Sequence, residues 1–285
     1  MKHPINETSK IVLWLIAMVC VGLYAVKNVL EVTPTTDFID PLVYLFVLIG
    51  AIGLGAVFWI IVMKNMKPEN VDNVFAIAVG MITGRALFIL FPFLNNIGAW
   101  PSFIAKMCLM VIGYYVFLRL VRTMQKSWKH AKKYVWISNL WVNASIAVAA
   151  TMIAVDIAPW IACVALFVIA CYDAWAVWKS KTMIKMAQYF LKRRIFPGIA
   201  VPYRNEEKFA MLGGGDIFFI VMVAASFYRN DLLTMYLTAG SMTAATSLLF
   251  FMSTKNKFYP ALPFIFGGLL VGIALRFAIW TVMLI

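Results

Sequence analysis

Histidine is scarce in this 285-residue sequence. The two histidines, His3 and His130, both lie in polar connections between long apolar runs. No HExxH pattern is present, which excludes a membrane zinc protease of that type. Because no imidazole lies inside an apolar run, a Ser-His hydrolase within the bilayer and a bis-histidine haem site are excluded as well. Catalysis inside a membrane would have to use carboxylates.

Phosphate-binding patterns and paired cysteines are missing too. The sequence contains neither a P-loop nor a dinucleotide-binding glycine fingerprint at a strand-to-helix turn, which argues against an ATP-driven pump. The four cysteines lie within apolar runs without paired spacing, so we interpret them as inert packing residues. We therefore expect no metal ion and no organic cofactor.

Charge is also low, and apolar residues dominate. Charged residues make up 13% of the chain and hydrophobic residues 64%, with a mean hydropathy of +0.88. Runs long enough to cross roughly 30 Å of hydrocarbon, at about 1.5 Å per residue, can be marked in nine places. These runs cover residues 11–30, 42–63, 72–94, 100–120, 134–155, 158–178, 209–228, 232–252 and 260–284. We predict an all-α, multi-pass integral membrane protein with nine transmembrane helices.

The net charge of +13 is unevenly distributed along the chain. Most lysines and arginines fall in alternate connections, beginning with the segment before the first run. Positive connections mark the cytoplasmic side, so we predict that the N-terminus is inside and the C-terminus outside. The basic excess then indicates topology and contact with an anionic lipid bilayer. We expect no nucleic-acid partner.

The longest connection divides the chain. It covers residues 179–208, is rich in lysine and arginine, and separates a six-helix part (1–178) from a three-helix part (209–285). We interpret it as a basic cytoplasmic loop. Within it, apolar residues alternate with prolines and a glycine over Ile195–Tyr203. This stretch is either a strand that pairs with an unwound substrate or a disordered linker, and the sequence leaves both open.

Two aspartates, Asp173 and Asp216, are the only acidic residues well inside the apolar runs. A carboxylate in hydrocarbon is costly and is a functional candidate by default. Counted from the ends of their runs, both lie roughly 8 to 11 Å below the cytoplasmic boundary. Two neighbouring carboxylates in a low-dielectric site share a proton, so that one acts as base and the other as acid. This arrangement suits peptide hydrolysis by an activated water and needs no metal.

Glycines and prolines flank the two aspartates. Three consecutive glycines, residues 213–215, directly precede Asp216. They weaken a helix and leave amide groups accessible to a substrate strand, although close helix packing also accounts for them. The last run opens with the segment Tyr259–Pro263, in which two prolines hold the backbone extended. An ordinary helix start is the alternative interpretation.

Three motifs in this order resemble the presenilin and signal peptide peptidase family of intramembrane aspartyl proteases. The motifs are Tyr172-Asp173, the GxGD pattern Gly213-Gly214-Gly215-Asp216, and Pro260-Ala261-Leu262. The resemblance covers the order of all nine runs. It implies that Asp173 and Asp216 form the catalytic pair of a GxGD-type endopeptidase that cleaves transmembrane helices within the bilayer. It also implies that the other motif residues shape the active site and bind substrate.

The details are closest to presenilins. The predicted orientation and the following Pro263 match that branch, whereas the second motif position, often Leu in the family, is Gly214 here. The connection after residue 178 is far shorter than in animal presenilins, which argues against a cut there and against obligatory partner subunits. The resemblance implies a prokaryotic, archaeal-type homologue in the cell membrane, whose partners are substrate transmembrane segments. Homo-oligomer formation stays open.

Two other functions use the same residues. A proton- or cation-coupled transporter or leak channel could bind ions at both aspartates, but transporters often show two related halves with matching broken helices. The nine runs divide six and three, and we find no such symmetry. Prepilin and preflagellin peptidases also contain GxGD, but they give no reason for the proline-flanked start of the last run.

Overall fold

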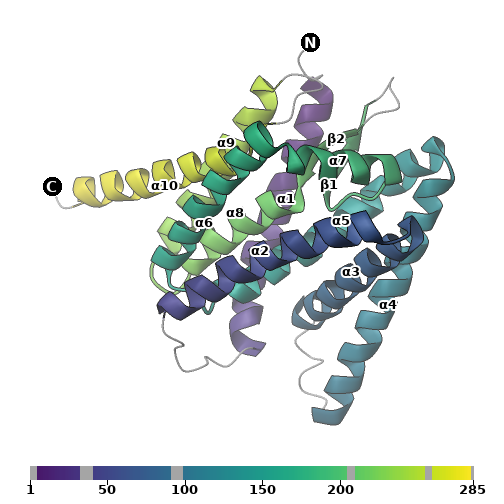
Figure 1. Ribbon diagram of the computed structural model, residues 1–285. Coiled ribbons are helices and arrows are strands. Elements are labelled where there is room, and N and C mark those ends of the chain that lie inside the picture. Colours follow the sequence, from purple (N-terminus) through teal and green to yellow (C-terminus); the bar gives the residue numbers. More distant parts are fainter. Residues whose placement is uncertain (1–4, 33–40, 91–98, 204–208, 254–258, 284–285) are drawn as a thin grey trace.

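The computed structural model describes residues 5–32, 41–90, 99–203, 209–253 and 259–283. Ten α-helices, one π-helical turn (η2) and two strands lie in these ranges (Figure 1). Their bounds are α1 Ile5–Val32, α2 Pro41–Asn65, α3 Pro68–Leu90, α4 Ala99–Lys126, α5 Trp128–Ala154, α6 Pro159–Trp175, η2 Ala176–Ser180, α7 Thr182–Arg193, β1 Gly198–Pro202, β2 Phe209–Gly213, α8 Gly214–Ser226, α9 Leu232–Met252 and α10 Leu262–Met283. The chain is an almost entirely helical protein.

Six helical segments in the described ranges are long and apolar enough to cross a membrane. They are α1, α4, α5, α6 with η2, α9 and α10. This confirms the predicted integral, multi-pass membrane protein. The other three predicted runs overlap α2, α3 and α8. The count of nine crossings and the orientation of the termini stay predictions.

The predicted helix over 209–228 was wrong at its start. Residues 209–213 form β2, which pairs antiparallel with β1, so that Gly198 lies opposite Gly213 and Pro202 opposite Phe209. Helix α8 follows with 13 residues, or roughly 20 Å, less than the hydrocarbon thickness. The strand adds roughly 16 Å at about 3.3 Å per residue. Strand β1 is buried in protein and β2 lines a cavity, which are the two settings in which extended backbone is tolerated at membrane depth.

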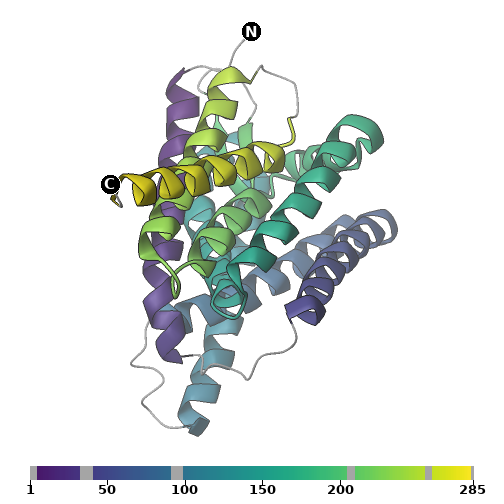
Figure 2. The same cartoon turned by 90° about the vertical axis from the view of Figure 1, so that its left-hand side faces the viewer.

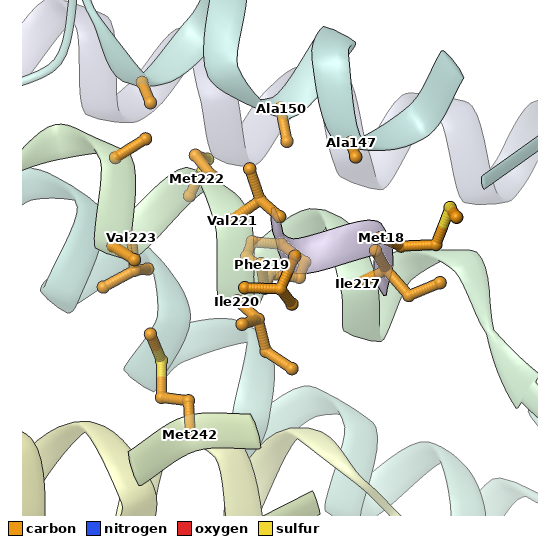
Figure 3. Packing of buried hydrophobic residues seen from close by; sticks show 14 of the residues in the cluster. Met18, Ala147, Ala150, Ile217, Phe219, Ile220, Val221, Met222, Val223 and Met242 are labelled. Carbon is orange, nitrogen blue, oxygen red and sulfur yellow. The ribbon is translucent and has the colours of Figure 1, made fainter. Parts of the chain in front are cut away.

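Helix α8 lies at the centre of the molecule. It contacts α1, α5, α6 and α9, and after Asp216 it is apolar on nearly all sides, as expected of a helix enclosed by others. In Figure 3, Val221 faces Ala150 of α5, and Ile217 lies beside Met18 of α1. Packing from several sides fixes the position of α8, and therefore of Asp216 in its first turn.

A polar cluster attaches the end of α7 and the residue after it to the start of α3 and the end of α4. The buried Asp72 carboxylate accepts hydrogen bonds from Gln125 (3.0 Å) and from Arg193. The Arg194 guanidinium donates to the backbone carbonyls of Met124 and Gln125, each at 3.2 Å. These bonds hold the end of α7 against α3 and α4; Figure 1 shows where α7 lies in the fold.

Helix α10 packs along α9 and then extends away from the bundle (Figures 1 and 2). Its Arg276 side chain binds Asp231, the N-cap residue of α9. The Asp231 carboxylate also accepts from the Thr234 hydroxyl (2.7 Å) and the Leu233 N–H (3.0 Å). Arg276, followed by Thr234, lowers the pKa of Asp231 from 3.8 to about 2.

This ion pair predicts a small, pH-dependent contribution to stability. Because the folded pKa of Asp231 lies below the unfolded value, the contribution is complete above about pH 4 and is lost as the pH falls towards 2. Arg276→Gln is expected to lower Tm at pH 7 by no more than about 2–4 °C, since the pair is partly exposed. Thermal unfolding at pH 7 and pH 2 checks this, and an equal Tm difference at both pH values would contradict it.

Candidate active site

One cavity of about 930 Å³ contains both intramembrane aspartates. Its wall is built from α6, η2, α7, β2, the first turns of α8, the end of α9 and the segment leading into α10. Among the residues predicted from the sequence to form the site, seven line this cavity: Tyr172, Asp173, Gly213, Gly215, Asp216, Ala261 and Leu262. Gly214 and Pro260 are buried and are not among the lining residues. Three segments far apart in the sequence therefore meet at one place.

Asp173 lies near the end of α6 and is buried. Its Oδ2 accepts a hydrogen bond from the backbone N–H of Leu262, at 3.3 Å. Leu262 is the first residue of α10, where backbone N–H groups have no partner within the helix. The first residue of α10 thus supplies a donor that orients the Asp173 carboxylate.

Asp216 is held by the start of its own helix. Gly213 is the N-cap residue of α8, and Asp216 is the third helical residue. The Asp216 carboxylate accepts a hydrogen bond from the Gly213 N–H, which is the return contact of a capping box. The positive end of the helix dipole lies at this carboxylate. The side chain is half-buried, with access to the cavity.

The two carboxylates line the same cavity. They come from α6 and α8, which are in contact. Two such groups in an apolar cavity hold one proton between them more readily than two negative charges. One carboxylate is then available to accept a proton while the other donates one.

The glycines before Asp216 have different surroundings. The Gly214 N–H donates to the carbonyl of Pro197 at 2.8 Å, and a Cβ on Gly214 would lie 2.7 Å from that oxygen and 2.6 Å from Ile146. A Cβ on Gly213 would lie 3.2 Å from the Asp216 carboxylate, whereas Gly215 has open space. Close approach of the hairpin therefore explains why Gly214 stands where the family motif often has Leu.

Tyr172 lines the cavity. It is exposed, and its ring centroid lies 6.0 Å from that of Trp175 on the same helix. Both rings lie near the end of α6, where the backbone passes into the π-helical turn η2. Such turns are frequent at functional sites.

The sequence did not indicate most of the apolar lining. Phe219 follows Asp216 by three residues and Ile169 precedes Asp173 by four, so helical periodicity places both on the aspartate faces. No local signal marks Trp128 or Phe250, which reach the cavity from α5 and α9. The described part of the chain contains no cluster of three metal-ligating His, Cys, Asp or Glu side chains.

The arrangement defines a multi-pass membrane protein with a carboxylate pair in an apolar cavity. A scan against protein-family models finds no match, and a search of curated proteins finds no relative. Among solved structures, the chain is similar to a presenilin family intramembrane aspartate protease in a C222 crystal form, with 12% identity, a TM-score of 0.67, and coverage of 96% of this chain and 99% of that one. A P2 crystal form of such a protease matches with 13% identity, a TM-score of 0.59, and coverage of 93% and 97%. The chain therefore has the presenilin-family protease fold over nearly its whole length.

Proposed function

We propose that this protein is a GxGD-type intramembrane aspartyl endopeptidase that cleaves transmembrane helices of membrane-protein substrates. The observation that carries the proposal is the meeting of Asp173 and Asp216 in one cavity beside strand β2. The fold, shared with presenilin-family intramembrane aspartate proteases, supports it.

The proposed chemistry uses the two carboxylates in opposite protonation states. The charged carboxylate accepts a proton from a water molecule as the water oxygen attacks the scissile carbonyl carbon. The protonated carboxyl donates a hydrogen bond to the carbonyl oxygen, which becomes the tetrahedral oxyanion. The C–N bond breaks as the nitrogen accepts the proton that the first carboxylate took from the water, which leaves a new carboxyl group and a new amine and restores the charged carboxylate. The N–H groups of Leu262 and Gly213 hold the carboxylates in orientation for this exchange.

Strand β2 offers a place for an unwound substrate. A peptide bond inside a helix is shielded and must be extended before attack, and an extended peptide pairs readily with an open strand edge. All five residues of β2, Phe209–Gly213, line the cavity, and the strand leads directly to Asp216. The segment Ile195–Tyr203 contains β1, so it is not a disordered linker, and the partner of β1 is β2 rather than a substrate. We propose that the substrate joins β2.

We also propose which molecules are the substrates and in which membrane the protein acts. Transmembrane segments would reach the cavity from the bilayer of a prokaryotic cell membrane, with their N-termini outside. No obligatory partner subunit is required, since both carboxylates and the strand belong to one chain. Homo-oligomer formation remains open.

The segment before α10 provides a test of the orientation of Asp173. Leu262→Pro removes the N–H that donates to Asp173, and proline is tolerated at the first position of a helix. Leu262→Ala loses the same side chain but keeps the N–H. We expect kcat of the Pro variant to fall below that of the Ala variant by about tenfold or more, because a hydrogen bond to a charged group is lost. Steady-state cleavage assays measure this, and equal kcat values would show that the N–H is dispensable.

A proteoliposome experiment separates the protease from the transporter. Purified protein is reconstituted with a single-span substrate, and cleavage is followed on gels while a pH-sensitive dye inside the vesicles records proton flux. Cleavage without flux supports the proposal. Flux without cleavage would favour ion transport through the aspartates.

A further inference from the structure

The outer edge of strand β1 is occupied by a side chain. Asn139 on α5 is fully buried, and its amide makes two hydrogen bonds to the backbone of Ala200, the central residue of β1. The Asn139 Nδ2 group donates to the Ala200 carbonyl (2.7 Å), and the Ala200 N–H donates to Asn139 Oδ1 (2.9 Å). The side chain thus takes the place of a neighbouring strand.

These contacts fix which backbone groups each strand presents. In an antiparallel pair, opposed residues alternate between pairs that exchange hydrogen bonds and pairs whose polar groups point outward. Because both groups of Ala200 go to Asn139, those of the opposed Met211 point outward from β2. Phe209 and Gly213 follow the same alternation, and the Gly213 N–H goes to Asp216.

The two outer edges of the hairpin therefore differ. On β1, the outward groups of Ala200 are bonded, and Pro202 has no N–H to offer. The five residues of β1 are buried or nearly so, whereas those of β2 line the cavity. Only β2 presents an edge to the aspartates.

We infer that Asn139 is a positioning residue: it closes the edge of β1 and holds the hairpin so that a substrate strand joins β2 in one register relative to Asp173 and Asp216. The inference rests on the proposed protease function. A shift of one residue along β2 would move the scissile bond by about 3.3 Å and turn its side chains to the opposite face. The two hydrogen bonds from α5 oppose such a shift.

Asn139→Leu tests this inference, with Asn143→Leu as the matched control. Asn143 lies one turn further along α5, is equally buried, and donates to the backbone carbonyl of Asn139 rather than to the hairpin. With a single-span substrate, we expect Asn139→Leu to lower kcat by about tenfold or more, because small displacements at a reacting centre are costly. Mass spectra of its products should change from one main cut to several neighbouring cuts. Asn143→Leu should keep the wild-type cut position.

A purely structural role for Asn139 would leave the cut position unchanged among the molecules that fold, and that result would overturn the inference. Hydrogen exchange provides a readout that needs no proteolysis. In Asn139→Ala, which retains the helix and is the fallback if the Leu variant fails to fold, the Ala200 amide should exchange roughly tenfold faster than in wild type. Unchanged exchange would also overturn the inference. If wild-type protein cleaves no substrate but the Ala200 amide exchanges faster in Asn139→Ala, the proposed protease function is wrong. The positioning of the hairpin by Asn139 would still stand.

Discussion

Asp216→Asn and Asp173→Asn are each expected to abolish cleavage of a transmembrane substrate while leaving the protein folded. Asn has nearly the same shape as Asp but cannot exchange the proton that the mechanism passes between the carboxylates. General acid–base catalysis alone contributes about 10²–10⁴-fold to a rate. Replacing one carboxylate ends the proton exchange on which both the acid and the base role depend. We therefore expect the cleavage rate of either variant to be lower by at least about 10³-fold. The Asn oxygen still accepts from Gly213 at position 216 or from Leu262 at position 173, which preserves the local structure.

Initial rates for wild type and both variants, measured in the same detergent, check this prediction. Thermal unfolding of each sample provides the control, and Tm should stay near the wild-type value because an isosteric change creates no cavity. Retained hydrolysis in either folded variant would refute the carboxylate pair. Loss of both activity and fold would instead show that the aspartates are structural.

Gly214→Leu, which introduces the residue often found in the family motif, is expected to disrupt the site rather than improve it. The added Cβ alone would lie 2.7 Å from the Pro197 carbonyl and 2.6 Å from Ile146, so the hairpin must move away from α8. Overpacking of this kind costs about 1–3 kcal/mol, and here it also breaks the Gly214–Pro197 hydrogen bond. We expect a lower Tm and little or no cleavage.

Gly215→Ala is the matched control, because a Cβ at that position meets open space. This variant should keep the wild-type Tm. Because Gly215 lines the cavity, any change in activity would result from the methyl group added to the cavity wall. Thermal unfolding and cleavage assays on both variants separate the two glycines. A Gly214→Leu variant as stable and active as wild type would contradict the close approach of Pro197.

Much of the site could be predicted from the sequence because its strongest signals are local. An acidic residue inside an apolar run is costly wherever it occurs, so Asp173 and Asp216 can be recognised as functional candidates from the sequence alone. The meeting of these residues with the Pro260–Leu262 segment followed from the order of the motifs. The structure brings Leu262 to Asp173 directly.

Only one strand of the hairpin could be anticipated: a strand within Ile195–Tyr203 was one of two interpretations, whereas β2 was predicted as helix. Residues 209–213 are apolar, and a short apolar run does not distinguish a buried strand from the start of a helix. It pairs with Gly198–Pro202, and that strand is bonded to α5 through Asn139 and Ala200, which are 61 residues apart. The Asp72–Arg193 contact, which anchors α7, joins residues 121 apart. Contacts between residues so far apart produce no periodic pattern in the sequence from which they could be predicted.

The most direct test of the central claim is mass spectrometry of the products formed by purified protein from a single-span substrate. We predict two complementary fragments whose cut lies inside the transmembrane segment, and no such fragments with Asp216→Asn. Wild-type protein that leaves the substrate intact, or fragments that persist with Asp216→Asn, would contradict an unassisted intramembrane aspartyl protease.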